Sequence, residues 1–462
     1  MKTKFFLIAF FAIFQTLFAQ DITGSWSGEL DVQGTKLPLI FNIHKDGNGY
    51  KSDFDSPMQG AKAIPIQKTD FQKNDITFDA SNIGITYKGQ LKGNKIEGNF
   101  SQNGMNLPLN LERKTNVETV LKRPQTPKPP FSYQTEEVFL NNETEGNKLA
   151  GTLATPKVFS KNSPILVMIT GSGAQNRDEE LFGHKPFAVI ADDFAKKGIA
   201  TLRLDDRGVG SSEKGKAGPT SADFSGDINS AVNFLAKRGY KNIGLIGHSE
   251  GGMIAPMVSL KNKNVKFMVL MAAPGKPTTE LLLKQSYDLG KAAGATEDVL
   301  KTNEMLNKKI FDYITHYKGK DLKLDIKSLL IEDLKKLPKE QITAEQIEQT
   351  AEAQAKQVSS PWFQYFIKFN PDNYLSKIKI PVLAINGGLD LQVSAKENLE
   401  GIKKSLTKAG NKNFETLEFP GMNHLFQNAK TGSVSEYGQI EETISPKVLD
   451  KMSEWILKTD NY

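Results

Sequence analysis

Apolar positions divide the chain into two regions with different periodicities. From residue 21 to about 114, short β-forming segments such as 37–43 and 75–79 are separated by glycine-containing turns such as 46–49. Strand-like segments that recur about every ten residues, without helical periodicity, are typical of an antiparallel barrel or sandwich. We therefore predict a small antiparallel all-β domain over residues 21–114.

From about residue 133, continuous apolar runs alternate with helical patterns in which apolar residues recur every three or four positions. The strand-like runs are 165–169, 200–204, 243–246, 265–270 and 382–385, and two of the helical patterns are 187–197 and 228–237. Continuous apolar runs suit parallel strands that are covered on both faces. We therefore predict an α/β domain over residues 133–462 with a mostly parallel sheet.

Two segments interrupt this organisation. Residues 115–132 contain Pro124, Pro127, Pro129 and Pro130 among polar residues. Such a segment is stiff and forms cores poorly, so it predicts an interdomain linker. Residues 275–378 are rich in lysine, glutamate and helix formers and have little strand character. They predict a helical insertion that caps the carboxyl ends of the strands.

Composition narrows the classes of function. The 59 basic and 53 acidic residues leave a formal charge of only +6. This excess is small and dispersed, so we expect no nucleic-acid partner. The chain has no cysteine, which excludes disulfides, thiolate nucleophiles and cysteine metal sites. Any chemistry that needs histidine must use His44, His184, His248, His316 or His424.

The first twenty residues predict a secretory signal peptide. Lys2 and Lys4 precede an apolar stretch from Phe5 to Phe14, and the small residue Ala19 follows. The apolar stretch is shorter than the ~20 residues of a membrane-spanning helix. We therefore expect cleavage after residue 20, no stable membrane anchor, and a periplasmic or secreted protein.

The strongest chemical motif is Gly247-His248-Ser249-Glu250-Gly251-Gly252, which lies between a predicted strand and a predicted helix. A serine in a sharp turn between strand and helix exposes its Oγ, and glycine neighbours permit the crowded backbone. The following helix supplies N–H groups and a partial positive charge. Ser249 is therefore the predicted nucleophile.

A serine hydroxyl needs a base, and His424 is the predicted one because it follows the apparent last strand, 414–419. We expect His248 to be a packing residue, since the turn directs its side chain away from the serine. Asp390 follows the strand-like run 382–385 and is predicted to orient the imidazole of His424, with Asp372 as a weaker competitor.

The predicted oxyanion donors are backbone N–H groups. One is that of Glu250, directly after the nucleophile. The other lies in the glycine-rich loop after residue 169, where we favour the N–H of Ser172 and keep Gly173 as the alternative. Arg177 in the same loop either anchors a substrate carboxylate or ties the loop to the domain.

These motifs together resemble the α/β-hydrolase fold family, closest to exported bacterial esterases and serine-aminopeptidase-like enzymes. The matching blocks extend over about 160–460 and comprise 171–173, 177–178, 206–210, 247–252, 361–363, 387–393 and 421–424. The resemblance implies an acyl hydrolase that uses Ser249, Asp390 and His424 and needs no metal or organic cofactor. A His-Gly pair often begins the oxyanion loop in this family, and Thr170 stands there instead.

Three functions remain open. The leading one is a serine esterase acting on a small-molecule carboxylic ester, with Trp362 and Phe363 lining an acyl pocket or forming a hydrophobic seam. The second is a peptidase or aminopeptidase on the same fold, which an acidic pair that binds a peptide amino terminus would favour. The third is a non-catalytic protein whose β domain binds a ligand or glycan. The glycine-flanked segments 24–28 and 89–93 resemble those of lipocalin-like barrels.

Overall fold

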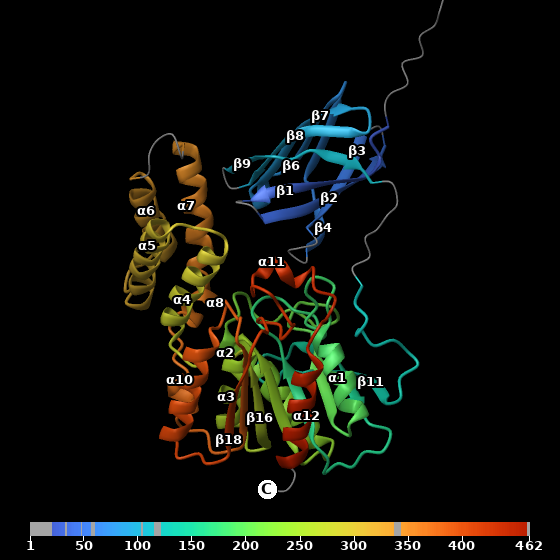
Figure 1. Cartoon of the computed structure of the whole chain (residues 1–462), viewed down its shortest axis with the longest axis vertical. Coiled ribbons are helices and arrows are strands. Elements are labelled where there is room, and N and C mark those ends of the chain that lie inside the picture. The colour runs from blue at the N-terminus through green and yellow to red at the C-terminus, as the bar shows by residue number, and fades with distance from the viewer. Residues whose placement is uncertain are drawn as a thin grey trace, which may run out of the picture.

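The computed structural model describes residues 21–459, apart from 33–34, 48, 57–60, 103–104, 115–121 and 337–342. It shows a β domain next to a group of helices, with a larger α/β domain below them (Figure 1). The predicted signal peptide, residues 1–20, lies outside the described residues. Within the described part of the chain, no helix combines the length and apolar character that a membrane span requires.

The N-terminal domain is an antiparallel barrel. Strand β10 pairs with both β1 and β8, which closes the sheet. The interior is filled by apolar side chains, among them the stacked rings of Phe41 and Phe78, whose centroids are 4.7 Å apart. The strands are β1 (Gly24–Val32), β2 (Thr35–Asp46), β3 (Gly49–Ser56), β4 (Ala61–Pro65), β5 (Lys68–Gln72), β6 (Asp75–Ala80), β7 (Ile85–Lys92), β8 (Lys95–Gln102), β9 (Met105–Pro108) and β10 (Leu111–Arg113).

The second domain contains a mixed sheet in the order β11-β12-β14-β13-β15-β16-β17-β18. From β14 to β18 neighbouring strands are parallel, whereas β11 and β12 form an antiparallel extension at one edge. The strands are β11 (Gln134–Asn141), β12 (Lys148–Thr155), β13 (Ile165–Ile169), β14 (Ala200–Leu204), β15 (Ile243–His248), β16 (Val265–Met271), β17 (Val382–Gly387) and β18 (Phe414–Phe419). The predicted mostly parallel sheet is confirmed.

Helices cover both faces of this sheet. Apolar side chains of α1 (Pro186–Lys196) and α12 (Pro446–Thr459) pack on one face, and those of α2 (Ser221–Lys237), α3 (Glu250–Lys261) and α10 (Ala395–Lys408) pack on the other. Because both faces are buried, the central strands are apolar along their whole length, which explains the continuous runs in the sequence. A short helix, α11 (Val434–Tyr437), precedes α12.

The expected helical insertion lies between β16 and β17. It comprises α4 (Thr278–Ala292), α5 (Glu297–Thr315), α6 (Leu322–Leu334), α7 (Ala344–Val358), α8 (Pro361–Phe366) and α9 (Asp372–Leu375). Its helices share a small core of their own, in which Ile314, Ile326 and Ala351 are fully buried. The insertion is therefore held together by its own packing as well as by contact with the sheet domain.

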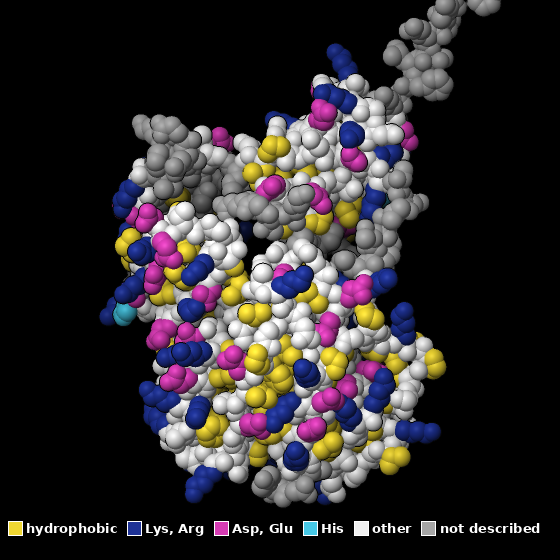
Figure 2. Space-filling model, viewed as in Figure 1, with side chains coloured by type: hydrophobic (Ala, Val, Ile, Leu, Met, Phe, Trp, Pro, Cys, Tyr) yellow, Lys and Arg dark blue, Asp and Glu magenta, His cyan; other side chains and the backbone are white. Residues whose placement is uncertain are grey.

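Charged side chains of both signs are interspersed over the face shown in Figure 2. Several join neighbouring helices of the insertion: Lys309 on α5 pairs with Asp333 on α6 at 2.8 Å, and Lys327 on α6 pairs with Glu348 on α7 at 2.5 Å. Exposed pairs of this kind contribute about 0–1 kcal/mol each. The apolar core, rather than these pairs, therefore accounts for most of the stability of the insertion.

Part of the predicted linker packs on the α/β domain. The Arg123 guanidinium donates to the carbonyl oxygens of Phe182 and Gly438 at 2.8 Å and of Ile440 at 3.1 Å. Gln125 donates to the carbonyl of Ile444 at 2.8 Å. The chain is thus fixed to the α/β domain from about residue 123 onward, while residues 115–121 of the predicted linker lie outside the described residues.

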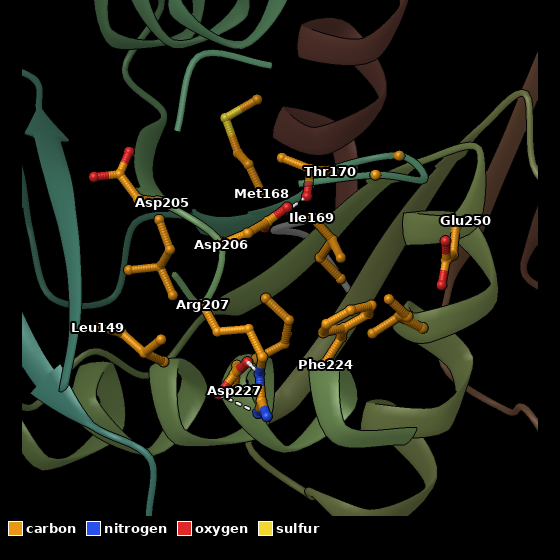
Figure 3. Close-up of a pocket in the computed structure, with 15 residues that line it drawn as sticks. Leu149, Met168, Ile169, Thr170, Asp205, Asp206, Arg207, Phe224, Asp227 and Glu250 are labelled. Atoms are coloured by element: carbon orange, nitrogen blue, oxygen red, sulfur yellow. Dashed lines mark hydrogen bonds and ion pairs between the residues drawn. The ribbon is translucent and has the colours of Figure 1, made fainter. Parts of the chain in front are cut away.

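Buried polar groups fix the loops at the carboxyl ends of β13 and β14 (Figure 3). Asp206, after β14, accepts hydrogen bonds from the Thr170 hydroxyl and the Gln175 N–H, each at 2.9 Å. Below it, the Arg207 guanidinium binds both carboxylate oxygens of Asp227, at 2.7 and 2.9 Å. Burial raises the pKa of Asp206 to about 7, although both hydrogen bonds oppose this shift.

The raised pKa of Asp206 predicts a pH-dependent stability. The Asp206 carboxyl binds its proton more tightly in the folded state than in the unfolded chain. The protonated carboxyl therefore contributes fully to the unfolding free energy below about pH 4, and this contribution is lost as the pH rises to about 7. Asparagine does not titrate, so the variant Asp206→Asn should not lose this stabilisation. As the pH rises from about 4 to about 7, we expect its unfolding free energy to increase relative to that of the wild type by up to about 4 kcal/mol. Urea denaturation at several pH values measures the difference, and parallel pH profiles for the two proteins would contradict it.

Candidate active site

The predicted nucleophile lies in a strained turn between β15 and α3. Ser249 has φ 52° and ψ −116°, a backbone conformation that costs energy for any residue with a Cβ. The flanking glycines make the turn possible: a Cβ on Gly247 would lie 2.2 Å from the carbonyl oxygen of Gly251, and one on Gly251 would lie 2.2 Å from that of Ile169. The sequence motif is therefore a steric requirement of this turn.

Asp390 and His424 form a buried pair. The Asp390 Oδ2 and the His424 Nδ1 are 2.7 Å apart, and the residues are 4% and 5% exposed. The other oxygen of Asp390 accepts the backbone N–H groups of Gln392 and Val393, both at 2.8 Å. These two bonds fix the carboxylate, so it holds the imidazole with Nδ1 as the donor and Nε2 free to act as a base. The competitor Asp372 pairs instead with Lys408 and Ser405.

Side chains from two directions hold the loop after β13. From one side, Asp206 binds Thr170 and Gln175. From the other, the Glu179 Oε1 accepts the Gly171 N–H at 2.7 Å. The Gly171 N–H is therefore not available to an oxyanion. The loop cannot move at either of these points without breaking a buried hydrogen bond.

The remaining donor candidates in this loop are the N–H groups of Ser172 and Gly173. Ser172 lines the same cavity as Ser249, whereas Gly173 lines a smaller cavity that shares Gly171 and Glu250 with it. This placement favours Ser172. Glu250 is the first residue of α3, and N–H groups in the first turn of a helix have no partner within the helix. The N–H of Glu250 is thus the natural second donor.

Ser249 and His424 line one cavity of about 320 Å³. The lining residues from the helical insertion are mostly apolar and comprise Leu281, Leu282, Trp362, Phe363 and Phe366, with Gln285 as a polar one. The lining residues from the α/β domain include the polar, uncharged side chains of Ser172, Gln175 and Gln392. Trp362 and Phe363 thus lie on the insertion and line the cavity that Ser249 also lines.

The side chain of Glu250 joins the insertion to the nucleophile turn. Its Oε1 accepts the Ser221 hydroxyl at 2.6 Å and the Trp362 indole N–H at 2.9 Å. The ring of Trp362 also stacks on Phe366, with centroids 5.0 Å apart. Helix α8, which carries both aromatic residues, is therefore attached to the residue that follows the nucleophile.

Arg177 lies elsewhere. Its guanidinium donates to Asp205 at 2.7 Å through Nη2, and to Glu137 at 2.6 Å and Thr152 at 2.7 Å through Nη1. It is not among the described residues that line the cavity. The structure thus does not place it as a substrate contact and gives it the other role considered, which is to tie the loop after β13 to β11 and β12.

Two side chains at the site were not expected from the sequence to have a role there, and both are buried. His248 is 6% exposed and Glu179 is 5% exposed. The Glu179 Oε1 lies 3.0 Å from the His248 Nδ1, and the His248 Nε2 lies 3.0 Å from the carbonyl oxygen of His424. Burial opposes protonation of His248, but Glu179, the His424 carbonyl and Asp390 outweigh it and raise the pKa of His248.

The other polar residues that the structure describes give no sign of a second centre. His184 is buried between the Thr443 hydroxyl and the Tyr437 carbonyl, and burial is the main cause that lowers its pKa to about 4. Among the described residues, no three His, Asp or Glu side chains are grouped so that they could hold a metal ion.

Comparison with known proteins identifies the family of the chain. The family model of the alpha/beta hydrolase fold matches residues 164–427. The curated esterase EstD of Thermotoga maritima is 25% identical over 334 residues, which is 71% of this chain and 69% of EstD. The solved α/β-hydrolase GrgF from Penicillium sp. sh18 is 16% identical with a TM-score of 0.46, over 71% of this chain and 100% of that chain. An esterase of Pyrococcus furiosus is 17% identical with a TM-score of 0.41, over 71% of this chain and 91% of that chain. The family model spans more than half of the chain, and the chain therefore belongs to the α/β-hydrolase fold family.

Proposed function

We propose that the protein is a serine esterase that cleaves carboxylic esters through an acyl-enzyme, with Ser249 as nucleophile, His424 as base and Asp390 as the residue that orients the base. The observation that carries this proposal is the buried 2.7 Å contact between Asp390 and His424 in the cavity that Ser249 lines. The similarity to EstD, an esterase, supports ester rather than amide cleavage.

The mechanism follows from the positions of these groups. His424 Nε2 accepts the proton of Ser249 as Oγ attacks the acyl carbonyl, and Asp390 stabilises the resulting imidazolium. The N–H groups of Glu250 and of Ser172, with Gly173 as the alternative, stabilise the negative oxygen of the tetrahedral intermediate. The alcohol leaves with the proton from His424. Water then attacks the acyl-enzyme by the same route and releases the acid.

The cavity favours small uncharged esters. The part lined by the helical insertion is mostly apolar and suits an acyl chain or ring, and the polar side chains that the α/β domain contributes offer neutral hydrogen-bonding groups to the alcohol. Two carboxylates also line it, as an aminopeptidase would require, but both are already bonded: Glu179 to Gly171 and His248, and Glu250 to Ser221 and Trp362. We therefore place the peptidase function second.

Replacement of the nucleophile tests the proposal. We expect Ser249→Ala to lower kcat for p-nitrophenyl acetate and butyrate by about 10³-fold or more, because only the oxyanion donors and binding remain. The exposed serine variant Ser328→Ala is the control and should match the wild type. Equal turnover by Ser249→Ala and the wild type would reject this nucleophile. Faster cleavage of aminoacyl-nitroanilides than of the esters would favour the peptidase instead.

Asp390→Asn tests the orientation of the base. Asparagine keeps the oxygen that accepts the N–H groups of Gln392 and Val393, but presents an NH₂ group to His424, which stabilises the wrong tautomer. We expect kcat to fall by about 10⁴-fold while the circular dichroism spectrum and melting temperature stay close to those of the wild type. A loss of less than tenfold would assign the orienting role to another group.

We also propose that the protein is exported, on the composition of its first twenty residues. Expression of the full chain in a bacterial host should yield a mature protein in the periplasm or medium. Mass spectrometry of its amino terminus should place the cleavage near Gln20. A cytoplasmic product that retains Met1 or Lys2 would contradict this.

A further inference from the structure

We propose that Glu179 and His248 are a positioning pair that holds the oxyanion loop and the loop of the catalytic base in register around Ser249. The inference rests on the proposed serine esterase mechanism and adds two residues that line the cavity but act through the loops they hold, and not as nucleophile, base or oxyanion donor. The pair connects three segments: the loop after β13, the end of β15 and the loop after β18.

The first contact fixes the oxyanion loop. The Glu179 Oε1 accepts the Gly171 N–H at 2.7 Å, and Gly171 lies against the nucleophile, since a Cβ built on it would be 3.4 Å from the Cβ of Ser249. Because one peptide N–H points to Glu179, the orientation of the next peptide is restricted as well. This is the peptide that carries the N–H of Ser172. The carboxylate of Glu179 therefore sets the direction of the proposed oxyanion donor.

The second and third contacts reach the base. The His248 Nδ1 lies 3.0 Å from the Glu179 Oε1, and the His248 Nε2 lies 3.0 Å from the backbone carbonyl oxygen of His424. The two imidazole rings are stacked at an angle, with centroids 4.7 Å apart. Both nitrogens of His248 thus face acceptors, so the ring binds best when both carry a proton.

Protonation makes the pair electrically balanced. Glu179 and His248 are both almost fully buried, and an unpaired carboxylate at this depth would strongly destabilise the folded protein. The imidazolium of His248 compensates this charge within 3.0 Å. Asp390, which faces His424 from the loop after β17, also favours the protonated form of His248. The pair therefore adds no net charge beside the oxyanion.

The backbone of Glu179 supports a specific role. Its φ is 52°, in the left-handed region that a residue with a long side chain rarely adopts. Such a conformation persists only where the surrounding contacts determine it. Here the contacts of the carboxylate with Gly171 and His248 do so.

Two variants test the pair. Glu179→Gln keeps the oxygen that accepts from Gly171 and His248 but removes the charge that favours the doubly protonated imidazole, so His248 can donate to only one of its two acceptors. His248→Asn shortens the side chain so that it cannot reach both Glu179 and the His424 carbonyl. We expect each to lower kcat for p-nitrophenyl acetate about 10- to 100-fold with KM changed less than about threefold, because geometry is lost mainly in the transition state. Affinity for a boronic acid that forms a tetrahedral adduct should fall by the same factor. The double variant should lose no more than the worse single variant, since both break one chain of contacts.

Glu137→Gln is the matched control. Glu137 lies on β11 and pairs with Arg177, which belongs to the same loop as Gly171. Neither residue lines the cavity, so kcat of this variant should stay within about twofold of the wild type. The pair would be rejected if Glu179→Gln kept the wild-type kcat, if it changed only KM, or if Glu137→Gln lost as much activity.

Labelling with a fluorophosphonate separates this inference from the proposed function. A wild-type protein that is labelled at Ser249, together with an undiminished rate in Glu179→Gln, would overturn only the positioning pair. A wild-type protein that is not labelled would overturn the serine esterase mechanism itself. Labelling that is fast in the wild type and about 10- to 100-fold slower in Glu179→Gln is the expected result.

Discussion

The arrangement of the site depends on one backbone turn. Ser249 adopts a φ of 52° because Gly247 and Gly251 let the chain double back between β15 and α3. This turn decides where α3 begins, and so fixes the position of Glu250, its first residue. A larger residue at either glycine would push the strand and helix apart and would displace several groups together.

Two buried carboxylates flank this turn, and they differ in their partners. Glu250 is held by neutral donors, a hydroxyl and an indole N–H, and links the core to the helical insertion. Glu179 is held by a peptide N–H and an imidazole, and links two loops of the core. The first arrangement joins the turn to the insertion, which lines the cavity with mostly apolar side chains, and the second joins it to the loops that carry Ser172 and His424.

The sequence predicted the fold, and it indicated three candidate residues for the site, because buried strands and the turn after β15 leave local patterns in the sequence. Apolar runs reveal buried strands, and the G-x-S-x-G turn with the chain order Ser249, Asp390, His424 is constrained by the topology of the sheet. Glu179 left no such signal, since its partner His248 is 69 positions away and the contact arises only from tertiary packing. Arg177 was ambiguous for a related reason. The sequence of a loop does not show where a charged side chain in it points. Two of the partners of Arg177 lie on β11 and β12, and no continuous apolar run in the sequence reveals these strands.

The anchoring of Arg123 on three carbonyl groups has a consequence for the barrel. Since the chain is fixed there, only the short stretch between Lys114 and Lys122 joins the barrel to the α/β domain. Eight peptide units span at most about 30 Å whatever their conformation. The barrel is therefore tethered within roughly one domain diameter of this anchor, and any molecule bound to it is kept at a high local concentration near the catalytic domain.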